Sequence, residues 1–190
     1  MSKTKILSIV FFVAAIVIGY FFVDSIAYDI QQEKKIKREE ARVINKLKQI
    51  RSGMIAYQRI NGQYTSDWDK LINFIDTGDF YLTERSEQII QREYGGDSVV
   101  INIDTLGTIP VYDSLFADIP NFDLQQLPFK PGTKTKFEIF ADKIIKGSVK
   151  VDVFEVKDPE PINPKRREDN NDKALRVGSR SEVTTSGNWE

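Results

Sequence analysis

The sequence predicts an α+β fold in which an N-terminal transmembrane helix continues into a long amphipathic helix that packs on a small antiparallel β-sheet. Three observations predict it: an uncharged apolar run, a helix-forming segment with a regular apolar stripe, and alternating β-branched segments further on. The order of these patterns divides the chain into a cytoplasmic tail (1–5), a transmembrane helix (6–23), an amphipathic helix (24–60), a small α+β domain (61–156), a Pro- and charge-rich linker (157–173) and C-terminal strands (174–190).

The apolar run has the length of a membrane-spanning helix. Its 18 uncharged residues would form a helix of roughly 27 Å, close to the hydrocarbon thickness of a bilayer. A cleaved signal peptide is an alternative, with a small-residue site at 25–27, although the apolar region of a signal peptide is usually shorter. A buried core helix is a third interpretation, but a helix that is apolar on every face needs a larger domain to cover it. The side chains expected to contact lipid are Ile6, Phe11, Phe12, Ile16, Phe21 and Phe22.

The flanking charges bear on the orientation of this helix. Lys3 and Lys5 precede it and favour a tail in the cytoplasm. On the other side the basic residues begin two or more turns beyond the apolar run and are mixed with glutamates, although a strict count of Lys and Arg favours the reverse orientation. We therefore expect a single-pass protein of the inner (cytoplasmic) membrane whose C-terminal domain is extracytoplasmic, in the periplasm of a two-membrane bacterium.

The composition argues against most kinds of chemistry. Lys and Arg number 27 and Asp and Glu 28, so the balance of charge predicts no nucleic-acid partner. The chain has no cysteine and no histidine, which excludes thiol nucleophiles, the usual general base and the commonest zinc ligands. We expect no enzyme activity, no catalytic residue, no cofactor and no metal site; an enzyme would have to rely on carboxylate, lysine, tyrosine or serine chemistry.

The segment after the apolar run is predicted to continue as a helix with one apolar face. Four positions are spaced by seven residues, and two more lie between them, so together they form a continuous stripe. The stripe either mediates a coiled coil between copies or packs on the sheet of the same chain, and Gly53 marks a point where the helix could bend. This predicted interaction stripe consists of Ile36, Val43, Leu47, Ile50, Met54 and Tyr57.

A stop signal closes this helix. Asn61 and Gly62 tolerate positive φ, which is a common way to end a helix, and Tyr64 follows. A short second helix is expected next, with a cap at Thr65 or Ser66, an apolar face that includes Trp68 and Leu71, and an end at Gly78.

The passage from Ile50 through Asn61-Gly62-Gln63-Tyr64 to Leu71 resembles the end of the long N-terminal helix in type IV pilins and type II secretion pseudopilins. In that family an apolar helix with a Tyr near its end gives way to Asn-Gly-x-Tyr, and a meandering sheet follows. The apolar run here contains no acidic residue, and Thr65 stands where Pro is usual. The resemblance therefore implies a pilin-like shape, with a membrane-rooted helix leaning on a small sheet, more than it implies a processed filament subunit.

The remaining sequence suggests short elements joined by turns. Residues 81–94 are rich in Glu, Gln and Arg and are interpreted as a third short helix. A strand is expected at 98–103, a turn at 105–107 and a returning edge strand at 108–112. Alternation at 137–141 and 149–153, with a turn between, predicts a second hairpin with one buried face.

The C-terminal third combines a polar linker with short strands. Acidic and amide residues at 168–172 offer oxygen ligands for Ca²⁺, but the spacing is not that of an EF-hand, so a solvated charge run is the simpler interpretation. Trp189 either packs on the sheet or is exposed in a loose end. The aromatic residues Phe116, Phe122, Phe129 and Phe140 are interpreted as core residues, with a ligand-binding surface as the alternative.

Together these patterns predict a membrane-anchored structural or interaction protein of a bacterial cell-envelope assembly, pseudopilin-like in form. Its expected partners are membrane lipid and other protein subunits, in homo- or hetero-oligomers. An anchored extracytoplasmic binding module is the alternative.

Overall fold

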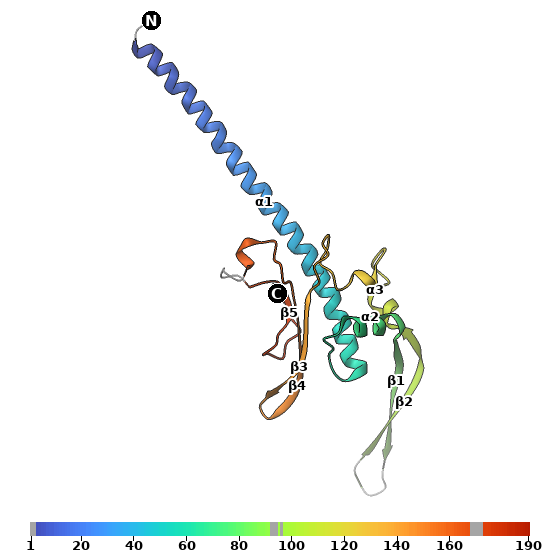
Figure 1. Ribbon diagram of the computed structural model, residues 1–190. Coiled ribbons are helices and arrows are strands. Elements are labelled where there is room, and N and C mark those ends of the chain that lie inside the picture. The colour runs from blue at the N-terminus through green and yellow to red at the C-terminus, as the bar shows by residue number, and fades with distance from the viewer. Residues whose placement is uncertain (1–2, 92–94, 96, 168–172) are drawn as a thin grey trace.

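The computed structural model describes residues 3–91, 95, 97–167 and 173–190. Its longest element is a single helix, α1 (Lys3–Asn61), which runs from the apolar segment into the body of the protein without a break. Figure 1 shows the N-terminal half of α1 standing free as a rod, whereas the C-terminal half is covered by the rest of the chain. The expected α+β architecture, with a long N-terminal helix followed by small antiparallel sheets, is confirmed.

The covered half of α1 lies between two groups of elements (Figure 1). One group is helical and comprises α2 (Trp68–Thr77), α3 (Val111–Phe116) and the 3₁₀ helix η1 (Leu124–Gln126). The other is an antiparallel sheet in the order β3-β4-β5, formed by β3 (Glu138–Lys146), β4 (Val149–Lys157) and β5 (Arg176–Gly178). Another 3₁₀ helix, η2 (Pro164–Arg166), precedes β5.

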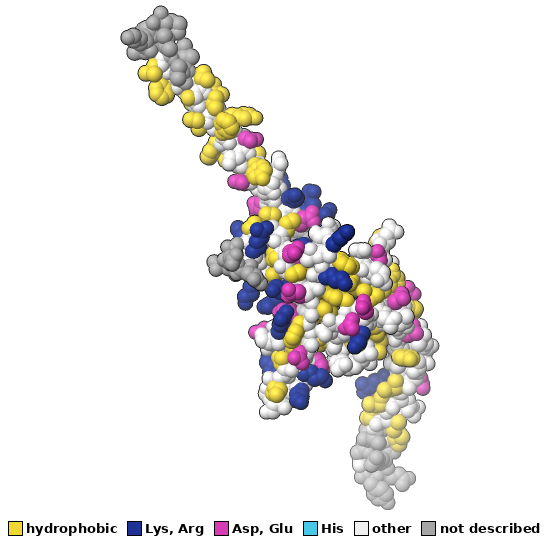
Figure 2. Space-filling view, in the orientation of Figure 1, with side chains coloured by type: hydrophobic (Ala, Val, Ile, Leu, Met, Phe, Trp, Pro, Cys, Tyr) yellow, Lys and Arg dark blue, Asp and Glu magenta, His cyan; other side chains and the backbone are white. Residues whose placement is uncertain are grey.

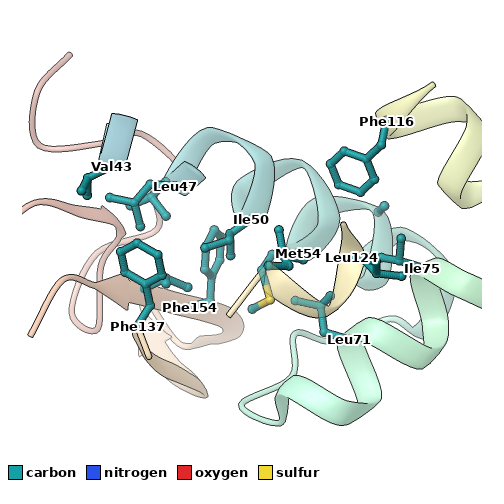
Figure 3. Packing of buried hydrophobic residues seen from close by; sticks show 14 of the residues in the cluster. Val43, Leu47, Ile50, Met54, Leu71, Ile75, Phe116, Leu124, Phe137 and Phe154 are labelled. Carbon is teal, nitrogen blue, oxygen red and sulfur yellow. The ribbon is translucent and has the colours of Figure 1, made fainter. Parts of the chain in front are cut away.

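The apolar stripe of α1 forms the centre of the core. Val43, Leu47, Ile50 and Met54 are 0–3% exposed, while Ile36 and Tyr57 at the ends of the stripe are half-buried. Figure 3 shows side chains from both groups of elements meeting the stripe. Full burial of one such side chain stabilises the fold by about 1.5–3 kcal/mol, so the stripe is a major source of stability. The labelled residues that pack around the stripe are Phe137 and Phe154 on the sheet side and Leu71, Ile75, Phe116 and Leu124 on the helical side.

The end of α1 has the expected geometry. Gly62 has a φ of +73°, and its N–H donates to the carbonyl of Gln58 at 2.8 Å. The side-chain amide of Asn61 donates to the carbonyl of Tyr57 at 3.1 Å, which satisfies another free carbonyl of the last turn. The chain therefore leaves the helix at the predicted Asn61-Gly62 pair.

The N-cap of α2 is not the one predicted. Asp67 caps the helix, because its carboxylate accepts from the N–H groups of Asp69, at 2.9 Å, and Lys70. Thr65 is buried, and its hydroxyl accepts from the N–H of Asp67, so it supports the cap from two residues upstream. Gly78 ends α2 as expected.

Two predictions for the middle of the chain are wrong. Residues 81–91 form a strand and not a helix, and no turn interrupts the second strand at 105–107. Strand β1 (Asp79–Gln91) pairs in antiparallel register with β2 (Asp97–Pro110), and an irregularity between Leu82 and Thr83 leaves one extra residue in β2. The helix propensity of residues 81–91 is outweighed here by their pairing with a strand rich in β-branched residues.

The second hairpin is confirmed, but its single buried face is not: the four consecutive residues 153–156 of β4 are all buried, so the second half of this strand is covered on both faces. β3 pairs with β4 along their full lengths, and the turn at Gly147 and Ser148 has positive φ at both residues. β5 returns to pair with β4, as the C-terminal pattern predicted. Trp189 packs half-buried against the core, and an isolated bridge joins Gly187 to Val177.

The linker between β4 and β5 is only partly solvated. Asp158 is 2% exposed, and Arg166 of η2 forms an ion pair with Glu40 of α1 at 2.7 Å. The segment is therefore attached to the body at two points. The proposed oxygen cluster at 168–172 lies outside the described residues.

Candidate interaction surfaces

The predicted anchor side chains are exposed along the free half of α1. Phe11, Phe12, Ile16, Phe21 and Phe22 are each 58–69% exposed, and Figure 2 shows that the coloured side chains along this part of the rod are mostly hydrophobic. The side chain of Ile6 lies outside the described residues. By length and composition α1 can cross a membrane, and its apolar window is 0% buried. The segment is thus not a core helix of this chain, while a signal sequence passes the same test of composition.

A basic band follows the apolar surface on α1. Figure 2 shows Lys and Arg side chains gathered where the rod meets the body. Lys37 pairs with Glu33 at 2.7 Å, and Arg42 pairs with Glu39 at 2.9 Å. The hydrogen bond and the attraction to Lys37 lower the pKa of Glu33, and the same contacts raise the pKa of Lys37. Lys34, Lys35 and Arg38 in this band are also exposed.

The described residues include a buried ion pair that the sequence did not reveal. The ammonium of Lys130 lies 2.9 Å from Asp158, and the two side chains are 9% and 3% exposed. Lys130 also donates to the carbonyl of Glu160, and the N–H of Glu160 donates to Asp158 at 3.1 Å. Both charges are thus compensated inside the fold, so the pair stabilises this loop and offers no free group for chemistry.

A second carboxylate holds the C-terminal segment on the sheet. Glu155 of β4 is 5% exposed, and it accepts from Arg176 at 3.1 Å and from Arg180 at 2.8 Å. The guanidinium of Arg180 also lies 4.9 Å from the ring centre of Phe140. Two arginines therefore fasten β5 and the residues after it to the middle strand.

Two shifted pKa values have structural explanations. Burial lowers the pKa of Lys46, against the attraction of Asp123, and its ammonium lies 5.4 Å from the ring centre of Phe122. Burial raises the pKa of Tyr64, and the charge of Asp152 adds to this. In both cases burial is the larger cause of the shift, and the nearby carboxylate is the smaller one.

The described surface has several shallow grooves. A groove of about 610 Å³ is lined by Lys130, Lys157, Arg166, Arg167, Glu160 and two prolines of the linker. Another of about 400 Å³ lies between α1 and the base of the first hairpin, with Ile55, Phe80, Leu82 and Leu115 in its walls.

The expected acidic and aromatic residues have structural roles. Within the described ranges no group of three or more carboxylates lies close enough together to hold a metal ion. Phe116 is buried and stacks on the half-buried Phe122, with ring centres 4.1 Å apart. Phe129 and Phe140 are half-buried beneath cationic side chains.

Sequence reasoning missed the exposed surface of the first hairpin. We call residues 83–90 and 99–106 of β1 and β2 the arm; Figure 1 shows them projecting away from the body. Every described side chain in these two ranges is exposed. The β-branched residues of both segments are the signal that could have identified this hairpin. The Glu and Gln residues of β1 obscured that signal, because they favour a helix. Its exposed apolar side chains are Ile89, Ile90, Val99, Val100, Ile101, Ile103 and Leu106.

Comparison of this chain with protein-family models, curated proteins and solved structures gave no match in any of the three. The surfaces described above are therefore the basis for assigning a function.

Proposed function

We propose that this protein is a single-pass, membrane-anchored structural or interaction component of a bacterial cell-envelope assembly, pseudopilin-like in form and without catalysis. The observation that carries the proposal is the division of α1 into two halves. The first half exposes an apolar surface of bilayer length, and the second half is the centre of the folded core. A continuous helix of this kind couples the position of the body to the membrane.

The surface of the body supports an interaction role. The buried charges are paired within the fold, while the arm exposes apolar side chains on an unfinished sheet. Exposed apolar patches of this kind mark sites of contact with other proteins. Other protein subunits and membrane lipid are therefore the proposed partners.

The proposed location is the inner membrane with the body in the periplasm. Support comes from Lys3 and Lys5 ahead of the apolar run and from the glutamates that dilute the basic band beyond it. Protease treatment of spheroplasts should digest the body while leaving a control cytoplasmic protein intact. Protection of the body in spheroplasts, with digestion only after lysis, would show that the body lies in the cytoplasm.

Membrane fractionation and the size of the detergent-released protein test the proposed function. Isolated membranes should retain the full-length chain after alkaline extraction, and mild detergent should release it as a species larger than the monomer or together with other proteins. Release of a shortened chain by alkaline extraction would identify the apolar run as a signal peptide. A monomer that co-purifies with nothing would exclude an assembly component.

A second candidate is an anchored binding module. The observation that favours it is the groove of about 610 Å³, whose lining includes three cationic side chains, Lys157, Arg166 and Arg167, and one acidic side chain, Glu160. Arg166 is paired with Glu40, so an anionic ligand would bind mainly at the other two cations. A thermal-shift screen of anionic sugars, nucleotides and phosphates against the detergent-solubilised chain would support this candidate if one class raised the melting temperature. Equal melting temperatures across the screen would remove it.

A further inference from the structure

The arm is a sheet with two unsatisfied edges. Among the described residues, strands β1 and β2 pair only with each other, and the described side chains of the arm are all exposed. A two-stranded ribbon is marginally stable in water by itself, and an open strand edge offers a row of free N–H and C=O groups to another strand. The arm is therefore a structure that a further strand would complete.

The charges of β1 have a specific order along its edge. The guanidinium of Arg85 lies 2.8 Å from the carboxylate of Glu87, so the two side chains share a face of the ribbon. The opposite face carries Glu84, whose cross-strand partner is Asp104. Like charges directly opposite each other destabilise a strand pair. The cross-strand pair of Glu84 and Asp104 is thus unfavourable within the arm.

We propose that β1 pairs edge to edge with β1 of a second copy of this chain, antiparallel and about a two-fold axis at Ser86. The product is a four-stranded sheet with each β2 on the outside and the two bodies at opposite ends. Residues 82–90 of both copies overlap over roughly 30 Å at about 3.4 Å per residue. This inference rests on the proposed function and names one partner of that interaction protein.

Charge complementarity selects this register. A two-fold axis at Ser86 places Arg85 opposite Glu87 of the second copy, and it does so twice because of the symmetry. It also places Gln88 opposite Glu84 of the second copy, where the amide donates to the carboxylate that Asp104 repels. Axes centred on Glu84, Arg85 or Glu87 would each place a charge opposite an identical charge, which costs stability.

The apolar residues agree with the same register. Leu82 comes opposite Ile90 of the second copy, at both ends of the overlap, so two exposed aliphatic side chains gain a neighbour. Cross-strand pairs of this kind are the stabilising unit of a sheet.

The edge of β2 does not offer an equivalent pairing. Its only charged residues are Asp97 and Asp104, so self-pairing of β2 brings no opposite charges together. Charged side chains on an edge strand discourage pairing with unrelated strands. On β1 the order of Arg85 and Glu87 favours the axis at Ser86 over axes centred on either of these two charged residues.

Charge reversal tests the pairing with the full-length chain in detergent, by sedimentation. Arg85→Glu and Glu87→Arg, each alone, should raise the dimer dissociation constant roughly tenfold or more, because each turns two attractive contacts into repulsive ones. An equimolar mixture of the two variants should regain the dimer, since every contact in the mixed dimer again joins opposite charges. Equal dissociation constants for the wild type, both variants and the mixture would overturn the proposal.

Disulfide trapping tests the position of the two-fold axis. The chain has no native cysteine, so any cross-link must form between the introduced cysteines. Ser86→Cys should cross-link two copies on oxidation, because the residue meets itself at the axis. Asn102→Cys is the matched control, since Asn102 is the cross-strand partner of Ser86 at the same height of the arm. Cross-linking of Asn102→Cys instead of Ser86→Cys would overturn the β1 pairing.

The outcome separates this inference from the proposed function. If the arm variants leave assembly size in the membrane extract unchanged, the pairing of arms is wrong while the role in an assembly stands. If the wild-type chain is a monomer that co-purifies with nothing, both are wrong.

Discussion

Gly53 of α1 lies directly against Ile75 of α2: a Cβ built on Gly53 would be 3.0 Å from the Cδ1 of Ile75. The glycine was expected to mark a bend in the helix. The structure gives it a packing role, because the missing side chain lets the second helix approach the stripe closely. Gly53 is itself buried, between Ser52 on the surface and Met54 in the core.

Substitution of Gly53 by a large side chain should destabilise the body. We expect Gly53→Leu to lower the free energy of unfolding by about 1–3 kcal/mol, the usual cost of an overpacked core. Gly53→Ala is the control, since its gain in helix propensity of about 0.5–1 kcal/mol opposes a small displacement of Ile75. Urea denaturation of the detergent-solubilised chain, followed by tryptophan fluorescence, measures both. Equal losses in the two variants would contradict close packing at this point.

Removal of one partner of the buried ion pair should be costly. Lys130→Met leaves the carboxylate of Asp158 uncompensated at 3% exposure, and we expect a loss of about 3–5 kcal/mol in the free energy of unfolding. The double variant Lys130→Met/Asp158→Leu should recover most of the loss, because no lone charge remains buried. A double variant as unstable as the sum of its single variants would show that the two side chains do not act as a pair.

The attachment of the C-terminal segment should depend on pH. The hydrogen bond from Arg51 to Glu190, at 2.8 Å, lowers the pKa of Glu190 below its ordinary value of 4.5. A lowered pKa in the folded state means that the stabilisation is present above pH 4.5 and is lost as the pH falls through the lowered pKa. Fluorescence of Trp189, assigned by comparison with Trp189→Phe, should report loosening of the segment on acidification. Arg51→Met should remove this transition, and an unchanged transition in that variant would contradict the assignment.

A charge within the apolar surface should weaken membrane insertion. Ile16→Arg places a cation near the middle of the apolar run, which costs about 2.5–3.5 kcal/mol on an insertion scale. We expect a larger fraction of the chain to be released by alkaline extraction of membranes. Gln31→Arg, an exposed substitution beyond the apolar run, is the control and should leave the distribution unchanged. Equal retention of both variants would argue against a spanning helix.

A glycine on the sheet should tolerate no side chain. Gly178 has a φ of +74°, and a Cβ there would lie 2.2 Å from the carbonyl oxygen of Phe154. Gly178→Ala should therefore destabilise the body by well over the roughly 1 kcal/mol that a positive φ costs a non-glycine residue. Gly147→Ala is the matched control, because Gly147 also has a positive φ, +56°, but has open space around it. Similar melting temperatures for the two variants would show that β5 can move away from β4.

The sequence by itself determined the features that depend on local patterns. The length of the apolar run, the stripe from Val43 to Met54 and the exit at Asn61-Gly62 follow from helical spacing and from the backbone freedom of glycine, which neighbours along the chain decide. The hairpin of β3 and β4 follows in the same way from alternation on either side of a turn. These elements were predicted because their propensities agree with their surroundings.

Only the tertiary structure decided the features in which distant segments compete or combine. Residues 81–91 carry a helix-like composition and become a strand because β2 pairs with them, and the contact between Gly53 and Ile75 exists because α2 folds back on α1. Likewise Lys130 and Asp158 are ordinary surface residue types in sequence, and they become a buried pair only when the linker crosses the body. Pairing and burial are long-range terms larger than local propensities, so a pattern within one segment does not contain them.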